Sequence, residues 1–346
     1  MTNRRIALLA LIGVAAFTVA GCSDDDSTGS VSVLLESEDT ILSGLDAGTE
    51  GEQIQDGWNV RFDSFIISVG DVAMTFSNNE STTADAHDVF VIDLTDVPAN
   101  GIALWDLNDL RVGRWEFGYA VEAATADAIQ DPSVSKEDYN RMVDEDLSYL
   151  IRGTLTQTGG ESCPPEASTT TNQTPNGNVG PDGDACYDNA SVEFELAVPV
   201  DTVYGPCEID EVPGVSVTEG TPRTVAASIH GDHIFFNGFP EGDESGVTRL
   251  AQWLADSDLN VDGTVEEQEL RNLAPSDLAE LDPAVYALGG SPIQPLENMW
   301  DYVQAQLKTQ GHFQGEGECA IDGVEHHHDD DEDEHDDDED KHDEDE

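Results

Sequence analysis

The sequence predicts a mainly β protein: an antiparallel β-sandwich followed by a helical segment and a disordered acidic tail. Up to about residue 245, apolar and polar residues alternate in short segments that Gly, Asp and Asn separate. From 247 to 307 the apolar residues recur at helical spacing. Residues 326–346 hold fifteen acids, five histidines and one lysine, so this segment has almost no apolar surface to bury.

The predicted strands begin at residue 31. They cover residues 31–37, 58–76, 87–95, 113–124, 148–157, 190–204 and 223–239. A helix interrupts them after Ser135, which can act as its N-cap with Asp138 three residues on. Residues 159–189 are too rich in Gly, Pro, Thr and Asn to be core, and we expect a surface loop there.

Helices are predicted in the second half of the chain, after the last strand. They lie in the segments 246–257, 265–274, 276–281 and 295–309. The expected divisions of the chain are a signal peptide (1–21), a tether (22–30), a β-sandwich domain (31–245), a helical segment (246–310), a closing segment (311–325) and the tail (326–346).

The leader has the parts of an export signal in order. Arg4 and Arg5 precede an apolar run that is too short for a spanning helix, and small residues follow it. The sequence VAGC at 19–22 resembles the lipobox of bacterial lipoproteins, which implies that Cys22 is lipidated and becomes the N-terminus. We expect a protein of the cell envelope, anchored to the outer membrane through this lipid alone. An ordinary signal peptide with an incidental cysteine is the alternative.

Four further cysteines indicate disulfide bonds. Because an exported protein meets an oxidising compartment, this even set predicts two disulfides with three possible pairings. We favour Cys163–Cys186, which closes the loop 159–189, and Cys207–Cys319, which ties the middle of the chain to its end. Metal binding by a cysteine pair is the alternative, but the sequence has no CxxC spacing.

The formal net charge of −61 restricts the partners of this protein. Nucleic acid and anionic lipid are excluded as natural partners, because their phosphates would be repelled. Divalent cations are favoured. Adaptation to a salty habitat is the alternative explanation of the acidity.

The stretch DLNVDGTVEEQE at 258–269 resembles an EF-hand calcium loop. Such a loop needs oxygen ligands at positions 1, 3, 5, 7, 9 and 12 and glycine at position 6, here Gly263. The expected calcium ligands are Asp258, Asn260, Asp262, the carbonyl of Thr264, Glu266 and Glu269. Regulatory EF-hands work in pairs, and the sequence offers no second loop, so we expect a structural role.

A second metal site is predicted from histidines. In a regular strand His230 and His233 would point to opposite faces, so a shared site needs a kink, which Gly231 makes possible. A Cys207–Cys319 bridge would bring His312 close to them. The expected ligands of Zn2+ or Cu2+ are His230, Asp232, His233, His312 and Glu316. The alternative is that these histidines only pack and form hydrogen bonds.

Three functions remain open at this stage. The leading hypothesis is a non-enzymatic, lipid-anchored calcium-binding protein. The second is a zinc- or copper-binding or delivery protein that uses the histidine cluster and collects metal on its tail. The third is a metal-dependent hydrolase, since an open coordination position could activate water. The order HGDH, calcium loop, GHFQGEGEC also resembles envelope lipoproteins of Gram-negative bacteria, which implies no particular activity.

Overall fold

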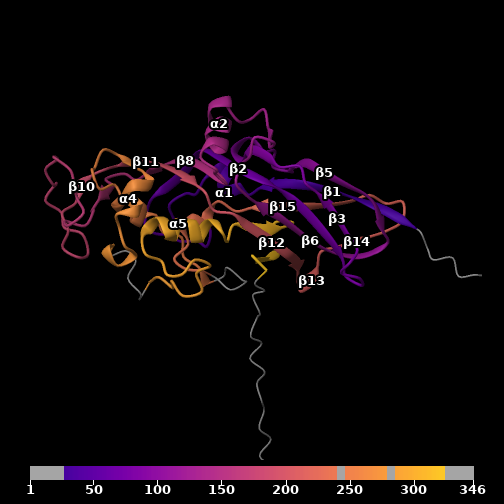
Figure 1. Cartoon of the computed structure of the whole chain (residues 1–346). Helices are drawn as coiled ribbons and strands as arrows, with labels where there is room; N and C mark the ends of the chain where they lie inside the picture. Colours follow the sequence, from indigo (N-terminus) through magenta and orange to yellow (C-terminus); the bar gives the residue numbers. More distant parts are fainter. Residues whose placement is uncertain (1–26, 240–245, 279–284, 324–346) are drawn as a thin grey trace, which may run out of the picture.

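The computed structural model describes residues 27–239, 246–278 and 285–323 (Figure 1). The leader with Cys22 and the tail 326–346 lie outside the described residues. The protein is mainly β, with 41% strand and 15% helix, and its two main sheets enclose one core, as the sandwich prediction requires. Among the described residues, no helix is both long enough and apolar enough to cross a membrane.

The smaller main sheet has four strands in the order β17-β15-β1-β5. These are Gly311–Phe313, Arg223–Ile229, Thr28–Ser37 and Ile102–Arg111. Most neighbours in the molecule are antiparallel, as predicted, but β1 and β15 run parallel. Their register ends with Ser37 opposite Ile229, so the residues that follow both strands emerge at the same edge.

The larger sheet has twelve strands and is built around β2 (Asn59–Phe76). Its main path is β13 (Val212–Pro213), β12 (Thr202–Ile209), β6 (Gly113–Val121), β2, β8 (Tyr149–Thr156), β11 (Ser191–Val198) and β16 (Thr264–Val265). The remaining members are β3 (Thr83–Ala86), β4 (Phe90–Asp93), β7 (Ile129–Gln130), β14 (Val215–Val217) and β18 (Glu318–Ile321). Strands β9 (Glu161–Ser162) and β10 (Tyr187–Asp188) form a separate pair.

Aromatic rings join the two main sheets. Phe117 of β6 stacks on Phe313 of β17 with ring centroids 5.0 Å apart. Within the larger sheet, Tyr119 packs at 5.0 Å against Tyr204 of β12. The Tyr119 hydroxyl donates a hydrogen bond to the carbonyl of His312 at 3.0 Å. Close packing of this kind fixes β17, and with it His312, against the larger sheet.

The helices are short. They are α1 (Asp39–Ser43), α2 (Lys136–Asp144), α3 (Gln252–Asp256), α4 (Glu267–Arg271) and α5 (Met299–Leu307), with 3-10 turns η1 (Leu94–Asp96), η2 (Asp232–Phe235) and η4 (Pro275–Asp277). Ser135 caps α2 as predicted, since its Oγ accepts from the N–H of Asp138 at 3.0 Å. In the described part of the segment 246–310 there are three of these helices, each shorter than its predicted range.

Both favoured disulfides are present. Cys163–Cys186 closes the loop 159–189, and Cys207–Cys319 joins β12 to β18. The second disulfide fixes a hairpin of β17 and β18, which occupies most of the predicted closing segment.

Candidate metal sites

The loop 258–269 folds back on its own side-chain oxygens. Asp258 accepts backbone N–H groups through both carboxylate oxygens, from Asp262 at 3.2 Å and Gly263 at 2.9 Å. Asn260 accepts from the N–H of Asp262 at 2.7 Å, and Asp262 accepts from Thr264 at 3.0 Å. These bonds draw the chain around positions 1, 3 and 5 of the loop, as a calcium-binding turn requires.

Two residues of the loop have left-handed backbone conformations. Gly263, at position 6, has φ of 91°, which glycine adopts without steric cost. Val261 has φ of 53° although it is β-branched and almost fully buried, with 4% of its surface exposed. A non-glycine residue in this region costs on the order of 1–3 kcal/mol and persists only where its surroundings enforce it. The rest of the protein therefore holds this loop in its turn.

The strand that follows the turn pairs with the main sheet. β16 runs parallel to β11, with Thr264 opposite Glu193 and Val265 opposite Phe194, and the N–H of Glu193 donates to the carbonyl of Gly263 at 2.8 Å. No partner for this solitary loop was predicted from the sequence. The structure supplies one in β11, a strand of the sandwich.

Glu269 closes the loop from its far end. One of its oxygens accepts the N–H of Leu259 at 2.9 Å and the other accepts that of Glu266 at 3.0 Å. Burial, together with the nearby charge of Asp258, raises the pKa of Glu269 to about 7, and burial also raises the pKa of Asp258. In the described chain these acids do not bring three ligand atoms within 4.8 Å of one another. Full coordination of an ion therefore needs side-chain movement, for which the exposed Asn260, Asp262 and Glu266 are free of packing.

The disulfide-closed loop 159–189 packs against the calcium loop. Asn189 donates to Asp258 at 3.0 Å, and the N–H of Thr170 donates to the carbonyl of Leu259 at 2.9 Å. The N–H of Cys163 donates to Asp256, just before the loop, at 2.6 Å. Figure 1 shows β10, from this segment, at the same end of the molecule as α4. The predicted surface loop is thus also a brace.

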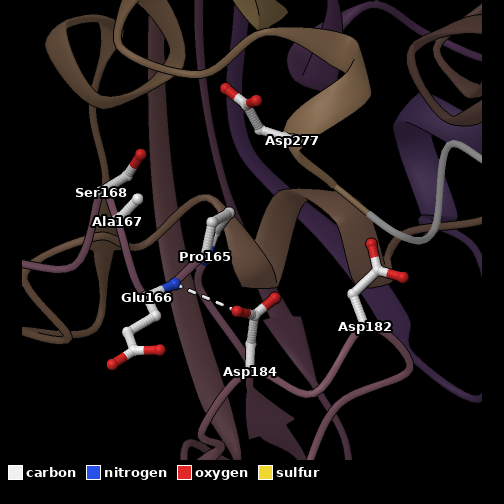
Figure 2. A pocket seen from close by; sticks show the side chains of 7 residues that line it. All are labelled: Pro165, Glu166, Ala167, Ser168, Asp182, Asp184 and Asp277. Atoms are coloured by element: carbon white, nitrogen blue, oxygen red, sulfur yellow. Dashed lines mark hydrogen bonds between the residues drawn. The ribbon is translucent and has the colours of Figure 1, made fainter.

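A hollow next to this brace is strongly acidic. It is lined by Pro165, Glu166, Ala167, Ser168, Asp182, Asp184 and Asp277 (Figure 2). Asp184 already accepts the backbone N–H of Glu166 at 3.1 Å. Its acids are not among the groups of converging ligand atoms found in the described residues. We therefore assign no metal to the hollow.

The three predicted histidines meet at the edge where β15 ends. The strand stops at Ile229, His230 follows it, and Gly231 starts the turn η2, which carries His233. The predicted kink therefore exists, and the HGDH sequence is not a regular strand. A Cβ atom on Gly231 would lie 2.5 Å from a side-chain carbon of Ile41, so the turn requires glycine. His312 lies on β17, opposite Ser228 of β15.

The imidazole rings of these residues form a compact group. His230 and His312 stack with centroids 3.9 Å apart, and His233 stands nearly perpendicular to both, at 87° and 77°. One ligand atom of each histidine lies within 4.8 Å of those of the other two. His230 and His233 are buried, each 2% exposed, and His312 is half-buried. Burial and the two neighbouring histidines lower the pKa of His312 well below its usual value, so this ring is neutral at pH 7.

Only one of the two predicted carboxylates lies beside the histidines. Asp232 is buried and forms a converging group with His230 and Glu38. Its Oδ2 accepts a hydrogen bond from Nε of Arg249 and forms an ion pair with Nη2, both at 2.5 Å, while its buried Oδ1 accepts no hydrogen bond. Glu316 is exposed and lies outside the converging groups found in the described residues. Glu38, which the sequence did not single out, lies 3.8 Å from Nδ1 of His230. Its only signal is the parallel β1–β15 pairing, which places residue 38 beside residue 230.

The remaining histidines lie away from this cluster or outside the described residues. The exposed His87 lies apart from the cluster and contacts Asp71 at 3.2 Å. The five histidines of the tail lie outside the described residues. Comparisons with protein-family models, with curated proteins and with solved structures found no match to this chain.

Proposed function

We propose that this chain is a non-enzymatic, lipid-anchored envelope protein that binds calcium in the loop 258–269. The position of the protein in the outer membrane rests on the leader and its lipobox. The calcium function rests on the loop, which combines the EF-hand spacing with the backbone turn at Val261 and Gly263. Both features are needed, because spacing alone does not orient the ligands.

The observation that best supports a structural role is the pairing of β16 with β11. In paired EF-hands this short strand joins two calcium loops, and calcium then opens a groove between helices. Here the strand joins the sandwich instead. Calcium bound at Asp258 and Glu269 would therefore link α3, α4 and the larger sheet. An extracellular site of this kind is expected to have a Kd of about 10⁻⁴ to 10⁻³ M.

The variant Glu269→Gln tests this function. It removes the charge of the bidentate ligand at position 12 but keeps hydrogen-bonding capacity, so calcium uptake measured by calorimetry should be lost. Glu267→Gln is the matched control, because Glu267 lies on the same helix, pairs with Arg271 and is not a predicted ligand. The proposal fails if the unmodified protein takes up no calcium, or if Glu269→Gln binds it as the control does.

A further inference from the structure

We infer that His230, His233 and His312, with Glu38 as their anionic neighbour, form a specific site for a divalent first-row transition ion such as Zn2+. This site is separate from the calcium loop and does not depend on it. Nitrogen ligands suit zinc and its neighbours in the periodic table, whereas calcium takes oxygen ligands. The two candidate sites therefore differ in the ions they select.

The distance between the Nε2 atoms of two of the rings suits coordination of one shared ion. Nε2 of His233 lies 3.3 Å from Nε2 of His312. With zinc–nitrogen distances of about 2.0–2.1 Å and tetrahedral angles, neighbouring ligand nitrogens lie roughly 3.3–3.4 Å apart. The two nitrogens thus already stand at the separation that a shared ion imposes.

Thr309 fixes the proton of His233 on the correct nitrogen. The Thr309 hydroxyl donates to the carbonyl of Gln306 at 2.8 Å, so at its 2.8 Å contact with Nδ1 of His233 it accepts. Nδ1 of His233 therefore carries the proton, and Nε2, which faces His312, carries the lone pair. Ligating histidines in metalloproteins are oriented by such a bond from their other nitrogen.

The same reasoning applies to His230. The carbonyl of Gly315 lies 3.1 Å from Nε2 and can only accept, so Nε2 carries the proton. The lone pair is then on Nδ1, the atom nearest Glu38. Glu38 is itself oriented by a hydrogen bond from the Thr40 hydroxyl. A carboxylate so placed supplies the negative charge that a buried divalent ion needs.

The scaffold around the rings is rigid. Arg249 binds Asp232 and also donates to the carbonyl of Gly51 at 2.6 Å, which ties the turn η2 to a distant loop. The hairpin that carries His312 and Gly315 is closed by Cys207–Cys319. The site is thus held from several directions, which favours one fixed coordination geometry.

Zinc retention by the full-length protein tests this inference. The protein is loaded with Zn2+, dialysed against a competing chelator that strips weak sites including the tail, and analysed for bound metal. We expect one tightly held equivalent, lost in His233→Gln and in His312→Gln with at least a hundredfold drop in affinity. His87→Gln is the matched control and should retain the ion. Glu38→Gln should weaken binding about tenfold, as loss of a supporting carboxylate does.

A second measurement keeps the test decisive if a histidine variant fails to fold. Thr309→Val keeps the shape of the side chain but removes the hydroxyl, and should weaken zinc binding about ten- to a hundredfold. Nitrogen-15 NMR of the histidine rings should show His233 protonated on Nδ1, and its Nε2 signal should shift on adding one equivalent of Zn2+. The inference is overturned if no equivalent survives the chelator, if His87→Gln loses it equally, or if the ring signals do not respond. Glu269→Gln should retain zinc, so failure of the calcium proposal would be distinguishable.

Discussion

The two candidate metal sites are built in opposite ways. The proposed calcium loop would take all its ligands from twelve consecutive residues and needs the fold only to hold its turn. The histidine site takes its residues from the ends of β1 and β15, from η2 and from β17, so it exists only when the smaller sheet is assembled. A contiguous site can be recognised from spacing, whereas an assembled one depends on tertiary structure.

Removing each disulfide in turn should have the largest and most different effects on the metal affinities of the two sites. Removing Cys207–Cys319 with paired Cys→Ser substitutions frees the hairpin of His312, so zinc affinity should fall at least tenfold and calcium affinity much less. Removing Cys163–Cys186 frees the brace on Asp258, and the order should reverse. Each variant is the control for the other. Equal losses of both metals in both variants would contradict this division.

The bridge between 207 and 319 spans 112 residues, and its loss should lower the free energy of unfolding by about 3–5 kcal/mol in urea titrations. An unchanged free energy of unfolding would contradict this expectation.

A glycine substitution should test how far the calcium loop depends on its backbone turn. Gly263→Ala places a side chain at φ of 91°, where no neighbouring atom lies closer than 3.8 Å, so its cost is conformational. We expect calcium binding to weaken about tenfold, equivalent to about 1.4 kcal/mol, while zinc binding is unchanged. Gly289→Ala, at an exposed glycine with ordinary φ and open space, is the control. Unchanged calcium affinity in calorimetry would show that the turn does not limit binding.

Lowering the pH should produce the smallest difference between the metal affinities of the two sites. Because the pKa of Glu269 is raised to about 7 in the calcium-free protein, protons compete with calcium below that pH. Calcium affinity should fall by up to about tenfold between pH 7 and pH 6. His312 stays neutral over this range, so the titration of this ring adds no pH dependence to zinc retention.

The same shift predicts the stability of the calcium-free protein. The folded-state pKa of Glu269 lies above its ordinary value of 4.5, so the folded state binds more protons between about pH 4.5 and 7. The free energy of unfolding should therefore fall as pH rises through this window. Urea unfolding without calcium measures this, and Glu269→Gln should flatten the dependence. A rise in stability over the window would contradict the assignment.

Alternation of apolar and polar residues was sufficient to predict most strands and the sandwich, and the spacing of Ser135 and Asp138 predicted the helix cap. It did not reveal β5, because Asp106, Asn108 and Asp109 give this strand the composition of a loop although Trp105 and Leu107 are buried. The parallel pairing of β1 with β15 joins segments almost two hundred residues apart, and nothing local signals it. The calcium ligands follow from spacing as one set and stay a prediction. For the histidine site, Asp232 was predicted and lies beside His230, whereas Glu316 was chosen over Glu38, whose proximity depends on that pairing.

The short strand β16 also has a consequence for solubility. It covers part of the outer edge of β11, at Glu193 and Phe194, where backbone groups would otherwise be available to a strand of another molecule. A protein that loses calcium and releases this strand would expose the edge while its core remained folded. Self-association of folded molecules, rather than unfolding, would then be the first sign of calcium depletion.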